Sequence, residues 1–299
     1  MDFLSSLELT GRMIRDVFSL ADSLKGERRA KPLAGKSVAL FFEEPSTRTR
    51  VSFEVAVAQL GGTPIYIDAR TSQRSRGEEL SDTARVLGSY CDFIVVRMND
   101  HDGLETIAKS APVPVINALT HLEHPTQALA DCYTLRERKG SVKGLKVAFV
   151  GDIAQNTANS LMVTAAKLGA SVSLVGPCGS RPNPVYVREA RRHASVTVTE
   201  SMEKGLDGAD ALYTDTFVSM GDEAEAARRR RLFMPYQLDR KALSYAKRDA
   251  VVMHPLPAHR GEEISADVID GPHSIVWEQA LNKLTIERAL LAYLSKRAH

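Results

Sequence analysis

The chain has 299 residues, which is enough for one large or two ordinary domains with real hydrophobic cores. Its composition, 43% hydrophobic and 25% charged, is that of a soluble globular protein, and a formal net charge of +2 gives no general attraction to nucleic acid or to a membrane. We see neither a signal peptide pattern nor an apolar run long enough to cross a bilayer. The three cysteines are widely spaced, which excludes a disulfide framework or a zinc spacing and indicates a cytoplasmic protein.

Strand-like and helix-like stretches alternate along most of the chain. Helical patterns occur near residues 11–25, 47–60, 78–89, 103–109, 126–137, 157–168, 184–193 and 279–297. Short apolar runs typical of buried strands occur at 37–42, 64–67, 93–97, 113–116, 145–151, 171–175, 210–214 and 249–253. This alternation predicts an α/β fold built of doubly wound parallel sheets.

A polar stretch with two glycines, residues 136–144, separates two such series. We therefore expect one domain over residues 1–138 and a second over residues 139–278. The helices expected near 11–25 and 279–297 each carry an apolar stripe, so we expect them to pack together. That packing would join residues 279–299 to the first domain.

The most informative segment is Ser46-Thr47-Arg48-Thr49-Arg50, which lies where an expected strand turns into a helix. The first turn of a helix has unpaired backbone N–H groups and the positive end of the helix dipole, and both favour an anion. Hydroxyl donors and guanidinium groups would complete a phosphate site without a glycine-rich loop. The alternative is a capped helix with a basic, solvated first turn. Because cations there oppose the dipole, we favour the phosphate site.

Other polar residues follow expected strands, and each admits a functional and a structural interpretation. Arg97 either lies on the surface or adds charge to the phosphate site, and His124 either donates to a carbonyl oxygen or belongs to a helix cap. Asn156 follows a strand without the glycines of a dinucleotide site, so it is either a ligand-binding amide or a helix N-cap. Asp215, four residues before Ser219, suits an ammonium ligand or a turn.

Three further segments are less specific. His254-Pro255-Leu256-Pro257 predicts a rigid turn that can hold a cis peptide bond and that exposes backbone carbonyl groups. The segment around Gln73 reads as an exposed polar loop, with no reason to prefer binding over solvation. The basic block Arg228–Arg231 could bind RNA, but no aromatic or second basic cluster accompanies it, so we expect a solvated face.

Together these segments resemble the aspartate/ornithine carbamoyltransferase family over nearly the whole chain. Ser46–Arg50 is similar to the family's carbamoyl phosphate signature, His124–Gln127 to its second signature, and Asp215 with Ser219-Met220 to its ornithine-binding loop. The resemblance implies a carbamoyl phosphate-binding domain and an ornithine-binding domain around a cleft. It also implies a homotrimer in which a neighbouring subunit lends Gln73. Neither a metal nor an organic cofactor is expected.

The resemblance implies a role for each site residue in carbamoyl transfer to L-ornithine, which gives citrulline and phosphate. Arg48, Arg97, His124 and Asp215 would be catalytic. The carbamoyl phosphate site would comprise Ser46, Thr47, Arg48, Thr49, Gln73, Arg97, His124, Gln127, Pro255, Leu256 and Lys283. The ornithine site would comprise Asn156, Asp215, Ser219 and Met220.

Of several departures from the family pattern, two fall in the expected carbamoyl phosphate site. Pro255 stands where ornithine enzymes usually have cysteine, and Lys283 stands where the family has arginine, so the planar guanidinium fork is lost. Two alternatives therefore remain. The chain could carbamoylate another amine, namely aspartate, an N-acylated ornithine or a diamine, or it could be a non-catalytic relative that binds carbamoyl phosphate.

Overall fold

The computed structural model describes residues 1–26, 30–218 and 225–297, and all structural statements concern these residues. The chain divides into two compact units, Met1–Ala130 with Lys283–His299 (unit 1) and Asp131–Asn282 (unit 2). The sequence pattern placed the boundary near residue 138. The two compact units meet inside two helices, α5 (Pro125–Lys139) and α12 (Val276–Ser295).

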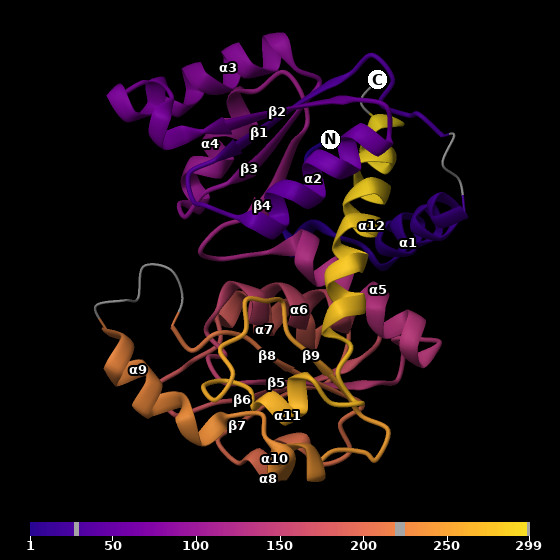
Figure 1. Cartoon of the computed structure of the whole chain (residues 1–299), viewed down its shortest axis with the longest axis vertical. Helices are drawn as coiled ribbons and strands as arrows, with labels where there is room; N and C mark the ends of the chain where they lie inside the picture. The colour runs from indigo at the N-terminus through magenta and orange to yellow at the C-terminus, as the bar shows by residue number, and fades with distance from the viewer. Residues whose placement is uncertain (27–29, 219–224, 298–299) are drawn as a thin grey trace. The chain divides into compact units, whose positions relative to one another are not determined.

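Unit 1 is built on a four-stranded parallel sheet with the strand order β2-β1-β3-β4 (Figure 1). All four strands were expected. They are β1 (Ser37–Phe42), β2 (Thr63–Asp68), β3 (Phe93–Arg97) and β4 (Val115–Leu119). β1 and β3 have the expected ends, and the ends of β2 and β4 differ by one to three residues. The helices of this unit are α1 (Gly11–Gly26), α2 (Thr47–Gln59), α3 (Leu80–Tyr90) and α4 (His101–Ser110), with the start of α5 and most of α12.

Alternation along the strands of unit 1 gives each face of the sheet its own core. Ala39 and Phe41 of β1 and Ile94 and Val96 of β3 point to one face, because successive side chains of a strand point to opposite sides. On that face they pack in one buried cluster with residues of α3 and α4: Leu80, Ala84, Leu104 and Ile107.

The first and last long helices both belong to unit 1. The Arg288 guanidinium of α12 donates to the carbonyl oxygen of Leu24 in α1 at 3.3 Å. Ile14 and Phe18 of α1 and Ile286 and Leu290 of α12 are fully or almost fully buried. The expected packing of the two end helices is confirmed.

Unit 2 is built on a five-stranded parallel sheet with the strand order β7-β6-β5-β8-β9 (Figure 1). Its strands are β5 (Lys146–Val150), β6 (Ser171–Val175), β7 (Val196–Thr199), β8 (Ala211–Thr214) and β9 (Val251–Met253). Its helices are α6 (Asn156–Lys167), α7 (Pro184–Arg191), α8 (Met202–Leu206), α9 (Ala226–Phe233), α10 (Arg240–Ser244) and α11 (Ala266–Ile269). The sequence did not predict β7, α8, α9, α10 or α11, all of which are short.

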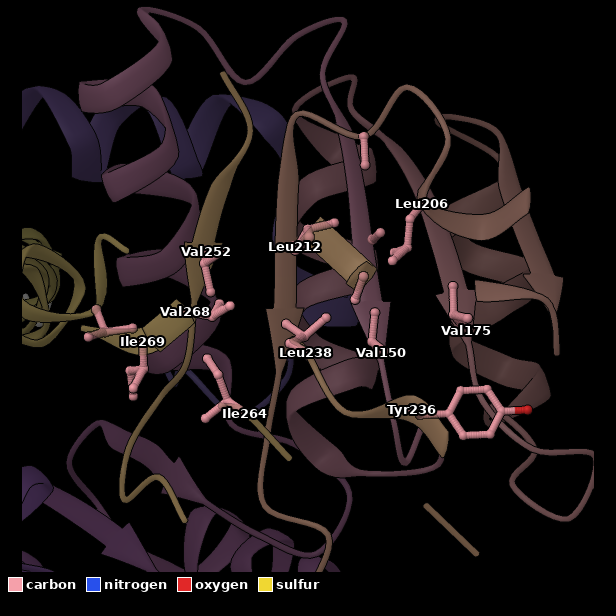
Figure 2. Packing of buried hydrophobic residues seen from close by; sticks show 14 residues of the cluster. Val150, Val175, Leu206, Leu212, Tyr236, Leu238, Val252, Ile264, Val268 and Ile269 are labelled. Atoms are coloured by element: carbon pink, nitrogen blue, oxygen red, sulfur yellow. The ribbon is translucent and has the colours of Figure 1, made fainter. Parts of the chain in front are cut away.

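The core of unit 2 on one side of its sheet is assembled from strands, a short helix and loops (Figure 2). Val150, Leu212 and Val252 come from β5, β8 and β9, and Val268 and Ile269 come from α11. All five side chains are at most 3% exposed. The short segments that lack a clear periodic pattern in the sequence are therefore held in place by this shared core.

Each sheet has one point at which the strand order reverses. In unit 1 the chain runs outward from β1 to β2 and then returns to β3 on the other side of β1. In unit 2 it runs from β5 through β6 to β7 and returns to β8 on the other side of β5. In open parallel sheets, ligands bind outside the carboxyl ends of the strands at such a switch point. The fold thus identifies β1/β3 and β5/β8 as places to search for a site.

The Arg228–Arg231 block forms part of α9 and is not simply a solvated face. The side chain of Arg229 is only 18% exposed; it binds the Asp152 carboxylate and donates from Nε to the carbonyl oxygen of Phe217 at 2.8 Å. Arg230 pairs with Glu262 at 2.9 Å. The expectation of a solvated block was therefore wrong for Arg229, because a long-range partner lies at the end of β5.

No helix among the described residues is long and apolar enough to cross a membrane.

Candidate active site

The turn from β1 into α2 lies at the switch point of unit 1. Ser46 is the N-cap residue of α2 in an extended conformation, but its side chain makes no capping hydrogen bond. Thr47 and Arg48 are exposed in the first turn, and Thr49 is buried. Since the first N–H groups of a helix have no partner within the helix, an uncapped start of this kind suits an anion.

The two arginines of this turn differ in their surroundings. Arg50 donates from Nε to Glu54 at 2.9 Å, and its guanidinium lies 3.5 Å from the centroid of the Tyr66 ring. These contacts account for Arg50 without a ligand, so the argument that both arginines require an anion was wrong for this one. The charge of exposed Arg48 helps to lower the pKa of Arg97, which shows that the two cations act on the same region.

Arg97 ends β3 directly beside the β1 residue Phe42. It is 7% exposed, and its Nε atom has no hydrogen-bond partner among the described residues. Burial lowers the pKa of Arg97 to about 10, with Glu44 opposing the shift and Arg48 adding to it. A buried guanidinium with an unused donor is expensive to maintain, and an anionic ligand would offset that cost.

His124 and Gln127 flank the start of α5 and share a partner from α12. Lys283 Nζ lies 3.3 Å from His124 Nε2 and 3.1 Å from Gln127 Oε1, and all three side chains are buried. Burial, followed by the charges of Lys283 and Arg97, lowers the pKa of His124 well below its usual value, so the imidazole is neutral. Because an ammonium group only donates, Nε2 accepts here, which assigns the ring proton to Nδ1 beside Thr126 Oγ1 at 3.4 Å.

Gln73 lies away from this group of contacts. It begins a 3-10 turn, Gln73–Arg76, and is exposed, as the polar loop predicted. Its side chain makes no hydrogen bond to any other residue that the structure describes. Within this chain, Gln73 is therefore an exposed amide in a short turn that Ser72 caps by accepting from the Arg74 N–H at 3.2 Å.

Asp215 directly follows β8 at the switch point of unit 2. Its carboxylate accepts from Thr157 Oγ1 at 2.8 Å and from the backbone N–H of Thr216 at 2.8 Å. Burial raises the pKa of Asp215, while His254 and the two hydrogen bonds oppose the rise. The carboxylate is thus fixed in direction and partly desolvated, which strengthens its attraction for a cation.

The turn after β5 brings a second set of polar groups to the same strand ends. Asn156 is the first residue of α6 and half-buried, whereas Gln155 is the N-cap residue, so the predicted alternative of Asn156 as the N-cap is not observed. The Gln155 amide donates to the carbonyl oxygen of Thr216 at 2.6 Å. Thr157, which holds Asp215, was missed because it is one of several polar residues in α6 and nothing in the local sequence distinguishes it from the others.

The loop after β9 contains the cis peptide bond that its prolines made an option. Leu256–Pro257 is a cis peptide bond, and Leu256 has a φ of 59°, which is uncommon for a residue other than glycine. Buried His254 anchors the loop by accepting from the Leu256 N–H at 2.9 Å and donating to Glu263 at 3.1 Å. Pro255 and Leu256 are half-buried. Nothing in the local sequence marks Glu263, because its role depends on the contact with His254, nine residues away.

Two predicted ornithine ligands and one cluster of metal-ligating side chains remain. Ser219 and Met220 lie outside the described residues. His259, Glu262 and Glu263 place one potential ligand atom each within 4.8 Å of one another. Arg230 already pairs with Glu262, and His254 with Glu263, so ion pairs account for these carboxylates and we assign no metal to them.

Comparison with known families shows which kind of protein carries these two groups of polar residues. Residues 1–137 match the carbamoyl-P binding domain of aspartate/ornithine carbamoyltransferase, and residues 143–294 match the Asp/Orn binding domain. The chain belongs to the aspartate/ornithine carbamoyltransferase family. The two matches correspond to the two sheets, so Arg48 and Arg97 lie in the carbamoyl-P binding domain and Asp215 lies in the Asp/Orn binding domain. Lys283 belongs to unit 1 but falls within the second match.

Members of this carbamoyltransferase family similar to the chain include both curated and solved proteins. The ornithine carbamoyltransferase of Pyrococcus abyssi is 46% identical over 98% of this chain and 95% of its own length. The solved ornithine carbamoyltransferase from Pyrococcus furiosus is 44% identical, with a TM-score of 0.91 over 97% of this chain and 96% of that one. The anabolic enzyme from Campylobacter jejuni is 37% identical, with a TM-score of 0.93 over 99% of both chains. The two-domain α/β fold predicted from the sequence is confirmed.

Proposed function

We propose that this chain is an ornithine carbamoyltransferase, which transfers the carbamoyl group of carbamoyl phosphate to the side-chain amine of L-ornithine. The observation that carries the proposal is the opposite charge of the two switch points. Buried Arg97 and Lys283 make one cationic, and Asp215 makes the other anionic. The first switch point would attract the anionic substrate, carbamoyl phosphate, and the second would attract the ammonium group of ornithine. The relatives named above are ornithine carbamoyltransferases.

Carbamoyl phosphate would bind at the start of α2. The phosphate would accept from Ser46, Thr47 and Thr49 and pair with Arg48, because these groups surround an uncapped helix N-terminus. The carbamoyl NH2 would donate to Gln127 Oε1 and to the backbone carbonyl groups of Pro255 and Leu256. Gln73 of a neighbouring subunit would add a further donor.

The carbamoyl oxygen would be polarised by Arg97, whose unused Nε donor suits a developing negative charge. His124, directly before α5, and Lys283, from α12, would contribute as well. For His124 to donate from Nε2, the Lys283 ammonium must turn from the imidazole toward the ligand and the ring proton must move to Nε2. Substrate binding would therefore rearrange the contact of 3.3 Å between these two side chains.

Ornithine would bind at the switch point of unit 2. Asp215 would pair with the α-ammonium group, and Asn156, Ser219 and Met220 would complete the subsite. The side-chain amine must be neutral to attack, although such amines titrate near pH ~10 in water. Its nitrogen bonds to the carbamoyl carbon, the bond from that carbon to the phosphate oxygen breaks, and the leaving phosphate takes the amine proton. Citrulline and inorganic phosphate result, and holding the two reactants together supplies much of the acceleration.

We further propose a cytoplasmic homotrimer with sites shared between subunits. The three cysteines are free, which suits a reducing compartment. In unit 1, Val86 and Tyr90 are exposed one turn apart on α3, and such apolar groups are commonly covered in an oligomer. Sedimentation analysis would test the trimer, and a mixture of inactive Arg48→Ala and Gln73→Ala subunits would test sharing, since mixed trimers would regain some active sites.

Turnover is the test of the proposed function. Purified protein supplied with carbamoyl phosphate and ornithine is expected to release phosphate and citrulline in equal amounts. Preference for another amine would move the assignment to a different carbamoyltransferase. Tight binding of carbamoyl phosphate without phosphate release, whatever the amine, would show a non-catalytic binding protein instead.

A further inference from the structure

Two buried charged residues stand one helical turn apart on α12. Lys283 Nζ lies 4.0 Å from Glu287 Oε1, and the exposed fractions of the two side chains are 6% and 0%. Residues four apart lie on the same side of a helix. The pair therefore points into unit 1, where Lys283 meets His124 and Gln127.

The mechanism above uses Lys283 but gives Glu287 no role. Neither carboxylate oxygen of Glu287 accepts a hydrogen bond from another described residue. The hydroxyl group of nearby Ser52 donates instead to the carbonyl oxygen of Thr49 at 3.2 Å. A buried carboxylate without hydrogen bonds is strongly destabilising unless a cation stands close, and Lys283 provides that cation.

Lysine has a particular need for such a partner at this position. Its ammonium group sits on a flexible stem of four carbons, whereas an arginine fork is planar and held by several parallel hydrogen bonds. His124 and Gln127 offer Lys283 neutral acceptors only, since the His124 imidazole is uncharged. A carboxylate one turn away stabilises the charged ammonium and limits where the stem can lie.

We propose that Glu287 is a positioning residue that acts on the carbamoyl phosphate subsite through Lys283, an inference that rests on the proposed function. When it is ionised, Glu287 keeps the Lys283 ammonium charged and directed toward His124 and Gln127. The lysine and the glutamate are one functional unit, and together they take the place of the family's arginine.

The charge state of Glu287 makes this role dependent on pH. Burial raises the pKa of Glu287 to about 8, although the charge of Lys283 opposes the rise. The other titratable groups close to Lys283 are His124, directly before α5, and Arg97, at the end of β3. The charges of Lys283 and Arg97 both lower the pKa of His124. Below pH about 8 the carboxyl group is largely protonated, so a neutral glutamine resembles it. Above that pH the carboxylate stabilises the ammonium, and a glutamine cannot.

The experiment compares wild-type protein, Glu287→Gln, Lys283→Met and the double variant in the complete enzyme. At pH 6.5, the KM of Glu287→Gln for carbamoyl phosphate should match that of wild type within about twofold. At pH 9 it should be about tenfold higher, a factor that corresponds to roughly one pKa unit. In the Lys283→Met background the same substitution should change KM by less than about twofold at both pH values. Urea unfolding of each variant checks that the fold is intact.

Two outcomes would overturn the inference. One is an equal rise in KM at both pH values, and the other is a rise that persists in the Lys283→Met background; either would show a structural role. A wild-type protein that forms no citrulline would overturn the proposed function but not this inference. In that case the dissociation constant of inorganic phosphate, measured by calorimetry for the same four proteins at both pH values, decides it by the same pattern.

Discussion

The switch points of the two sheets carry opposite charge and reach it in different ways. In unit 1, cations from three distant parts of the sequence gather, and Arg97 keeps an unused donor. In unit 2, a single carboxylate, Asp215, is fixed by two hydrogen bonds of 2.8 Å each. The comparison teaches that a multiply charged anion needs several cations, whereas one ammonium group needs a single carboxylate with a fixed direction.

The largest effect should come from removing a cation of unit 1. Arg48→Ala should lower kcat/KM by roughly a thousandfold, the upper range for losing one charged donor to a transition state. The melting temperature should hardly change, because Arg48 is exposed. Steady-state citrulline assays measure the activity, and thermal unfolding measures the stability.

A neighbouring arginine supplies the matched control for Arg48. Arg50 lies in the same helical turn but is held by Glu54 and Tyr66. Arg50→Ala should cost only a few-fold in kcat/KM. If both alanine variants lost activity equally, the turn would act as a general basic patch, and the distinction between the two arginines would fail.

The second prediction separates the two half-sites. Asp215→Asn should raise the KM for ornithine by about a hundredfold, because a buried charge-assisted contact to the ammonium is lost. Carbamoyl phosphate binding, measured by calorimetry, should stay within about twofold of wild type, since the anion occupies another subsite. A comparable loss of affinity for both substrates would contradict the idea of separate subsites.

A smaller effect should follow from loosening Asp215 without changing its charge. Thr157→Val removes the hydroxyl that donates to the carboxylate at 2.8 Å. One hydrogen bond to a charged group is worth about 1.5 kcal/mol or more, so the KM for ornithine should rise about tenfold while kcat changes little. An unchanged KM would show that the backbone N–H of Thr216 alone directs the carboxylate.

The smallest predicted effect concerns stability. Burial raises the pKa of Asp215 in the folded chain above its ordinary value of 3.8. At a pH between the unfolded and the folded pKa, the folded chain binds more protons than the unfolded chain, so stability falls as pH rises. At neutral pH the ionised carboxylate therefore destabilises the free enzyme. Asp215→Asn should raise the melting temperature at pH 7 by a few degrees, and the gain should shrink toward pH 3.8. A lower melting temperature at pH 7 would contradict this sign.

The sequence predicted the features that are encoded locally. The strand before Ser46 is an unbroken apolar run, and the helix after it has clear periodicity, so β1 and α2 were found within one residue of their ends. Arg97 and Asp215 were found because each follows such a run. The short edge strand β7 was missed because two of its four residues, Thr197 and Val198, are exposed and give no buried run.

Contacts between distant segments could not be predicted. Thr157 and Asp215 are 58 residues apart, and Lys283 and Gln127 are 156 apart. The expected boundary at residue 138 rested on a polar stretch, but α5 runs through the start of that stretch to Lys139. The local sequence carries no sign of the contact between Arg50 and Tyr66, because Tyr66, whose ring Arg50 covers, lies on the separate strand β2.

The most direct test of the account is a comparison of acceptor amines. Carbamoylated product is measured from carbamoyl phosphate with ornithine, acetylornithine, aspartate, putrescine and lysine under the same conditions. The account predicts efficient turnover with ornithine and little with acetylornithine, since acylation removes the ammonium that Asp215 should bind. Equal or better turnover with acetylornithine or aspartate would contradict the assignment of the two half-sites to an anion and an ammonium.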